Sequence, residues 1–298
     1  MAVSTLFIKR RIRSVGNTRK ITKAMELVSA AKMRKAVHMA VASRGYSHSL
    51  KDIVEEISAR IDPFLHQLLF GRKDSKNILA IVVASDRGLC GGFNAQLLRK
   101  ALEFLQRRTE SEINVVTLGK RADRAVKRAG YKIAASFEPI AKAPSFEKAQ
   151  PISQYVHNEF IAGKVDRVFI VYTDFKSAIS QIPTVEQLLP IIPEDKLPAG
   201  AGSNEDEIRE SESSNILFEP NAKEILEQLL PRLVGIKIYQ ALLESAASEH
   251  SARMLAMQNA TSNASQMIDD LTFTFNQARQ AGITREILEI SAGKAAIE

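Results

Sequence analysis

The last quarter of the chain has the pattern of one continuous helix, residues 221–292, that is too long for a compact domain to bury. Its last proline is Pro231, and beyond it apolar or small residues recur at alternating steps of four and three. The positions that form this seam are Tyr239, Leu243, Ala246, His250, Met257, Ala260, Ala264, Ile268, Leu271, Phe275 and Ala278. At ~1.5 Å per residue the helix would extend about 108 Å, so most of it must pack on something outside its own globular domain. The pattern predicts a coiled-coil helix over residues 221–298.

The opposite end of the chain offers a partner for this helix. Residues 4–61 contain no proline, and their only glycines are Gly16 and Gly45. A second helix of about 87 Å is therefore expected within residues 1–61. We expect the two terminal helices to pair as an antiparallel coiled coil.

Between the two helices the pattern changes to that of an α/β domain, which we place at residues 77–192. Continuous β-branched runs predict buried strands, and helical periodicity appears between them. The expected strands are 77–85, 113–118, 131–135, 167–172 and an edge strand at 182–189, and the expected helices are 95–108, 121–129 and 146–161. This alternation predicts a Rossmann-like, mostly parallel sheet that is covered on both faces. Residues 193–220, rich in acidic residues, serine, proline and glycine, are expected to form a flexible acidic loop.

The positive charge is concentrated at the start of the chain. Residues 1–44 carry eleven lysine and arginine side chains against one carboxylate, that of Glu26. Two interpretations remain open: a face that binds an acidic partner, or a merely solvated basic face. A nucleic-acid surface also fits the charge, but no aromatic stacking residues are interleaved with it, so nucleic acid is not an expected partner.

The sequence also limits where the protein works. Cys90 is the single cysteine, which excludes an internal disulfide and favours a reducing, cytoplasmic compartment. The longest apolar run, residues 78–84, is far too short to span a bilayer, so no membrane span is expected. The arginine-rich start resembles a mitochondrial presequence, but it continues without a break into the helical pattern.

Motifs for catalysis or cofactor binding are missing. Neither GxxxxGK[ST] nor GxGxxG follows the first expected strand; instead residues 86–94 read DRGLCGGFN. That segment is either a tight turn that needs glycine or a functional surface loop with an exposed cysteine, and both interpretations remain open. The five histidines have no ligand spacing, HExxH and GxSxG are absent, and no metal, cofactor or catalytic residue is expected.

Polar residues interrupt the final helix. They are Arg253, Asn259, Thr261, Asn263, Arg279, Gln280, Thr284, Arg285 and Glu286. About half of them are expected on a solvated face. The rest suggest that the helix meets several polar surfaces rather than one apolar groove.

The chain resembles the γ subunit of bacterial F-type ATP synthase over essentially its whole length. The segments that carry the resemblance are 12–35 (IRSVGNTRKITKAMELVSAAKMRK), 85–94 (SDRGLCGGFN), 181–189 (QIPTVEQLL), 247–260 (ASEHSARMLAMQNA) and 278–289 (ARQAGITREILE). The resemblance implies a rotor shaft inside an α3β3 hexamer, with the α/β domain contacting the ε subunit and the c-ring. It implies a non-catalytic subunit that couples proton flow to ATP synthesis or hydrolysis at the cytoplasmic face of the bacterial inner membrane.

The resemblance also implies which residues contact the β subunit. They are Met25 and Arg253 on the shaft, Asp86, Arg87 and Cys90 on the loop, and Arg279, Gln280, Thr284 and Glu286 near the end of the chain. Two positions depart from the family pattern: Arg285 replaces a frequent glutamine, and Lys294 replaces a small residue. The Lys294 side chain either extends toward solvent or loosens the bearing around the shaft tip. The other hypotheses, a nucleotide-dependent enzyme and a basic nucleic-acid scaffold, lack the required motifs.

Overall fold

The computed structural model describes residues 5–58, 66–69, 71, 76–108, 112–138, 145–191 and 222–295. The chain divides into two compact units. We name residues 32–252 the domain unit, and residues 1–31 together with 253–298 the terminal unit. The expected acidic loop at 193–220 lies outside the described residues.

The domain unit is built on one five-stranded sheet. Its strands are β1 (Asn77–Val83), β2 (Glu112–Leu118), β3 (Lys132–Phe137), β4 (Arg167–Phe175) and β5 (Gln181–Leu189). The spatial order is β3-β2-β1-β4-β5. The first four strands are mutually parallel, and β5 pairs with β4 in the antiparallel direction. The predicted Rossmann-like sheet, including its edge strand, is confirmed.

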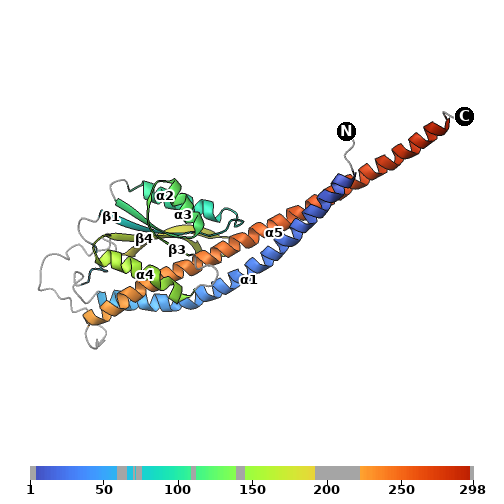
Figure 1. Cartoon of the computed structure of the whole chain (residues 1–298). Coiled ribbons are helices and arrows are strands. Elements are labelled where there is room, and N and C mark those ends of the chain that lie inside the picture. Colours follow the sequence, from blue (N-terminus) through green and yellow to red (C-terminus); the bar gives the residue numbers. More distant parts are fainter. Residues whose placement is uncertain are drawn as a thin grey trace. The chain divides into compact units, whose positions relative to one another are not determined.

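Three helices cover the sheet, and the side chains of β1 point alternately to the helices on its two faces. These helices are α2 (Phe93–Gln106), α3 (Lys120–Arg128) and α4 (Phe146–Ile161). On one face of β1, Ile78, Ala80 and Val82 pack with buried residues of α2 and α3. On the other face, Leu79, Ile81 and Val83 pack with α4 and with the two long helices. Figure 1 shows α2 and α3 on one side of the sheet and α4 on the other. Both faces of β1 are therefore buried, which accounts for its continuous apolar sequence.

The long helices are α1 (Thr5–Ser58) and α5 (Ala222–Ala295), and in the domain unit they run antiparallel. The contacts show the direction, because Ala36 packs with Ala246 and Ala247 whereas Ser43 bonds to Gln240. Moving forward along α1 therefore means moving backward along α5. Alanine lies on both helices at this contact, where a small side chain lets two helix backbones approach.

In the terminal unit the two helices are again paired, and they run antiparallel there as well (Figure 1). The Thr261 hydroxyl donates to the Thr22 hydroxyl at 2.8 Å. The residues of α5 that face α1 are those of the predicted seam: Met257 and Ala264 are buried, and Ile268, Leu271, Phe275 and Ala278 are half-buried. The predicted antiparallel helix pair is confirmed within each unit.

The alanine contact gives a stability prediction. Ala36→Leu should lower the free energy of unfolding by about 1–3 kcal/mol, because the added atoms would force apart helices that touch at Ala246 and Ala247. Ala42→Leu is the matched control, since Ala42 is an exposed position on the same helix. Urea unfolding of the whole chain measures both changes. Equal stability of the two variants would contradict close packing at Ala36.

Candidate partner-contact site

The loop after β1 holds three of the residues predicted to contact a partner. It leaves the sheet at the carboxyl end of β1, beside the point where the strand order reverses between β1 and β4. In open α/β sheets this switch point is the usual place for a nucleotide.

Internal hydrogen bonds fill the start of this loop. Asn94 Nδ2 donates to Ser85 Oγ at 2.8 Å and to Cys90 Sγ at 3.1 Å. Ser85 Oγ donates to the carbonyl of Arg87 at 2.7 Å, and the Ser85 amide donates to Asn94 Oδ1 at 3.2 Å. These bonds use the polar groups that would otherwise face a ligand at the switch point.

The expected exposure of Cys90 was wrong. The residue was expected to be exposed on the loop, but only 2% of its surface is accessible. The Sγ atom lies beneath the turn, in contact with the Asn94 amide and 3.9 Å from the Arg87 carbonyl oxygen. A free thiol behaves as a small apolar group, and burial under a tight turn suits it. Leu89, at φ 62° and 63% exposed, carries the exposed apolar surface of this loop instead.

The amino-terminal end of α3 is occupied as well. Asp86 Oδ1 accepts a hydrogen bond from the Lys120 amide at 3.1 Å, and the Ser85 carbonyl accepts one from the Arg121 amide at 3.2 Å. Gly119 adopts φ 91°, and a Cβ there would lie 2.2 Å from the Ala84 oxygen. The connections after β1 and β2 therefore close directly on each other. Two interpretations of this loop were open, a tight turn that needs glycine and a functional surface loop. The tight turn accounts for Gly91 at φ 54°. The exposed side chain of Arg87 also leaves a surface for contact.

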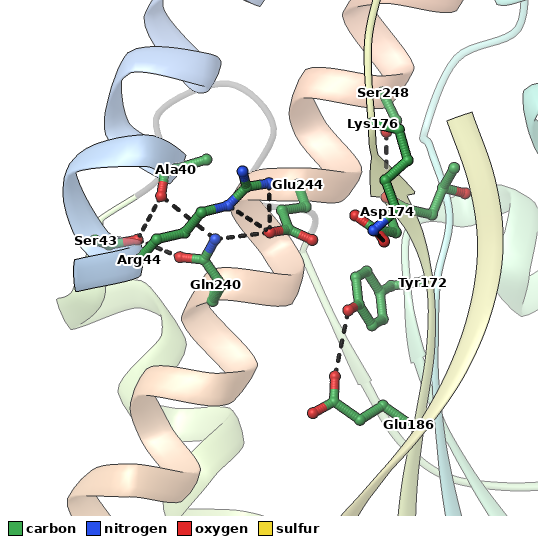
Figure 2. Close-up of polar contacts among 11 residues, drawn as sticks. Ala40, Ser43, Arg44, Tyr172, Asp174, Lys176, Glu186, Gln240, Glu244 and Ser248 are labelled. Carbon is green, nitrogen blue, oxygen red and sulfur yellow. Dashed lines mark hydrogen bonds and ion pairs between the residues drawn. The ribbon is translucent and has the colours of Figure 1, made fainter. Parts of the chain in front are cut away.

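A cluster of polar side chains, which we name the polar clamp, joins the helix pair to the sheet in the domain unit. Figure 2 shows Arg44 of α1 reaching Glu244 of α5, with Gln240 beside them. Arg44 Nη2 lies 3.1 Å from Glu244 Oε1, and Gln240 Nε2 donates to the same oxygen at 2.8 Å. Ser43 donates to Gln240 Oε1, so a second hydrogen bond crosses from α1 to α5.

The strands supply the other half of the polar clamp. Tyr172 of β4 donates its hydroxyl to Glu186 Oε2 of β5 at 3.2 Å, and Lys237 of α5 lies 3.5 Å from Glu186 Oε1. Lys176 pairs with Asp174 at 2.6 Å. A cavity of about 380 Å³ lies between Tyr172, Glu186 and Lys237 and the helix residues Arg44, Gln240 and Glu244. Burial, followed by repulsion from Glu186, raises the pKa of Tyr172 far above its ordinary value, so this hydroxyl stays a hydrogen-bond donor.

Two serines of α5 fasten the same helix to the end of β4. Ser248 Oγ donates to the Thr173 carbonyl at 3.2 Å, and Ser251 Oγ donates to the Ala178 carbonyl at 2.6 Å. Both serines are fully buried. α5 therefore covers the carboxyl end of β4, on the other side of the switch point from the loop at 85–94.

The terminal unit places the remaining predicted residues in two settings. Met25 is half-buried, and Arg253 is only 9% exposed. Every residue from 279 to 293 is exposed, which includes Arg279, Gln280, Thr284, Arg285 and Glu286. The side chain of Lys294 lies outside the described part, so its orientation stays a prediction.

Exposed apolar side chains accompany the polar ones on this part of α5. Ile283, Ile287 and Ile290 follow helical spacing and are 46%, 58% and 74% exposed, and Leu288 is 63% exposed. Side chains at such spacing share one face of a helix. The end of α5 thus offers both an apolar stripe and a polar group of residues for contact.

The polar clamp is what sequence analysis missed. Arg44 appeared there as one of eleven basic residues, and Glu244 was not singled out. A usable signal was the position of Glu244 between the seam residues Leu243 and Ala246, where a charge needs a partner. Within the described ranges no three His, Cys, Asp or Glu side chains gather as a metal site.

Together these features define a class of protein: an α/β domain whose loop at the switch point is hydrogen-bonded to itself, joined to an antiparallel helix pair that offers contact surfaces. No helix among the described residues is long and apolar enough to cross a bilayer. A family model described as ATP synthase matches residues 4–297.

Comparisons with curated relatives name the family. The chain is 42% identical to the ATP synthase gamma chain of Pelotomaculum thermopropionicum over 98% of both sequences. It is 41% identical to that of Heliobacterium modesticaldum, over 97% of this chain and 98% of the relative. The chain belongs to the ATP synthase γ chain family.

Solved structures agree on the fold. A chain from the Euglena gracilis mitochondrial ATP synthase OSCP/F1/c-ring structure aligns with a TM-score of 0.67 at 20% identity, covering 98% of this chain and 94% of that one. A chain from the Tetrahymena thermophila mitochondrial ATP synthase central stalk/c-ring structure aligns with a TM-score of 0.59 at 24% identity, covering 80% and 99%.

The polar clamp predicts a pH dependence. Burial raises the pKa of Glu244 above its ordinary value, the neighbouring Asp174 adds to the rise, and hydrogen bonds from Gln240 and Arg44 oppose it. The folded state therefore keeps this proton at pH values where the unfolded state has lost it. Glu244 stabilises the fold less as pH rises from about 4.5, the ordinary value, toward the raised value.

Glu244→Gln removes that titration. Between pH 5 and 7 the free energy of unfolding of this variant should therefore fall less with rising pH than that of the parent protein. Urea unfolding at several pH values measures the slopes. Glu289→Gln, on an exposed position of the same helix, should keep the parent slope. Parallel curves for Glu244→Gln and the parent would rule out a role for this carboxyl.

Proposed function

We propose that this chain is the non-catalytic rotor shaft of an F-type ATP synthase. It turns inside an α3β3 hexamer and couples proton flow through a c-ring to ATP synthesis or hydrolysis on the β subunits. The observation that carries the proposal is the antiparallel pairing of α1 and α5, combined with the fully exposed stretch 279–293 of α5. Family membership supplies the biological setting.

The closed switch point supports a mechanical role. Asn94, Ser85 and Cys90 bond to one another beside the switch point, where α/β domains commonly bind a nucleotide. The chain then acts through its shape. A single asymmetric shaft offers a different face to each of three β subunits, so each β subunit is biased toward a different conformation. Rotation moves these conformations around the ring.

The polar clamp gives the shaft a way to receive torque. Within the domain unit Arg44 ties α1 to Glu244 of α5, and Ser248 and Lys237 tie α5 to the strands β4 and β5. The α/β domain is the proposed contact for the ε subunit and the c-ring. A twisting force on that domain therefore reaches both helices through hydrogen bonds and apolar packing, at the cytoplasmic face of a bacterial inner membrane.

Contacts with β are assigned to three groups of residues. The exposed Arg279, Gln280, Thr284 and Glu286 form charge-assisted hydrogen bonds with a β loop that break and re-form at each step. Asp86 and Arg87, at the rim of the switch point, contact the C-terminal domain of β. Met25, which is half-buried, and Arg253, which is 9% exposed, are the contacts with β on the shaft itself. Since Cys90 is buried, it supports this loop from beneath.

The test replaces Arg279 and Gln280 by alanine in the assembled complex. Because both side chains are exposed in the chain itself, its unfolding midpoint should not change. Proton-driven ATP synthesis in reconstituted vesicles should fall by roughly tenfold, the expected effect of losing a charge-assisted hydrogen bond.

The matched control removes the same two chemical groups elsewhere. Gln96 and Arg99 are exposed on α2, and replacing both by alanine should leave synthesis near the parent rate. Unchanged synthesis in the Arg279 and Gln280 variant would remove these residues from the coupling mechanism. Equal losses in both variants would mean that the effect is not local to the end of α5.

A further inference from the structure

A basic cavity of about 590 Å³ lies in the domain unit, between the last turns of α2 and the strands β4 and β5. α2 starts at the carboxyl end of β1 and runs back along the sheet, so its last turns lie at the opposite end from the switch point. The cavity is therefore separate from the loop at 85–94, and nothing in the proposed rotor function uses it.

The walls of this cavity carry an excess of positive charge. Lys100, Arg107 and Arg108 line it, and Glu103 is the one carboxylate among its described lining residues. Lys100 and Glu103 are three residues apart on α2, and Arg107 and Arg108 directly follow the end of the helix, so all four line the same cavity. Lys100 and Arg107 have no hydrogen bond or ion pair from their side chains to any residue in the described part of the chain.

Arg108 is held in the cavity wall without a carboxylate partner among the described residues. Its guanidinium lies 3.9 Å from the centre of the Phe104 ring and 4.9 Å from that of Phe169. The two rings pack edge to face at 4.9 Å and fix its position. Burial, and then repulsion from Arg167, lowers the pKa of Arg108.

The end of α2 explains part of this arrangement. Cations near a helix C-terminus interact favourably with the helix dipole, and Arg108 Nη1 donates to the Phe104 carbonyl at 3.5 Å. That account does not cover Lys100, which lies two turns earlier. It also does not explain why the cations surround a cavity whose opposite wall includes Pro183 and Val185 of β5.

We propose that this cavity binds a phosphomonoester, with the phosphate between Lys100, Arg107 and Arg108 and an apolar substituent against Pro183 and Val185. Three cations against one carboxylate leave an excess of two positive charges. A phosphomonoester carries about −1.5 to −2 charges at pH 7 and matches that excess, whereas a single carboxylate does not. Guanidinium groups also pair with phosphate oxygens through two parallel hydrogen bonds.

The test titrates phenyl phosphate into the whole purified chain by calorimetry at low salt. Saturable binding at one site is expected, and Lys100→Gln or Arg107→Gln should each weaken it by about tenfold or more. These two residues are chosen because their side chains make no described contact that folding needs. Arg124→Gln is the control, since Arg124 is an exposed cation of α3 on the same side of the sheet and outside the cavity.

Vesicles distinguish a soluble source of the phosphate from a lipid. Binding to phosphatidic acid vesicles that is lost in Lys100→Gln and Arg107→Gln would support the cavity with a lipid headgroup as ligand. Binding of phenyl phosphate alone, with the same loss, would support it with a soluble ligand. Absence of saturable binding to both probes, or equal weakening by Arg124→Gln, would overturn the proposal.

Discussion

The close approach of α1 and α5 is the contact on which the rest of the structure depends. At Ala36, Ala246 and Ala247 the helices meet through buried side chains of one carbon. Because both helices also contribute to the core beneath the sheet, through residues such as Val54 and Leu230, they are part of the α/β domain and not appendages to it. Helix pairing and domain packing therefore stabilise each other.

The polar clamp fixes how the two packed helices are aligned along each other. An apolar interface alone tolerates sliding, whereas the bonds of Arg44 with Glu244 and of Ser43 with Gln240 fix one register between the helices. The carboxyl is mostly desolvated, so breaking this arrangement leaves a buried group without partners. A subunit that transmits twist needs such a fixed register, and this cluster supplies it where the helices meet the strands.

Most of the fold could be predicted because its signals are periodic. The seam from Met257 to Ala278 follows from spacing alone, and β1 follows from seven consecutive residues that suit a strand buried on both faces. The contact residues were harder, because spacing says nothing about which side chains meet across distant segments. Arg44 and Glu244 are 200 positions apart, and only the fold brings them together. Cys90 was misjudged because a loop position suggests exposure, whereas Asn94 and the turn cover the thiol.

The central claim is that α1 and α5 act as one unit, and a reversible crosslink tests it most directly. The hydroxyl oxygens of Thr22 and Thr261 lie 2.8 Å apart, so cysteines at both positions should form an intramolecular disulfide on mild oxidation. Cysteines at Thr22 and Thr272 should not, because Thr272 is exposed three turns further along α5. The account predicts that the assembled complex keeps proton-driven ATP synthesis with the first disulfide closed. Failure of that bond to form, or a loss of synthesis that a reductant restores, would contradict it.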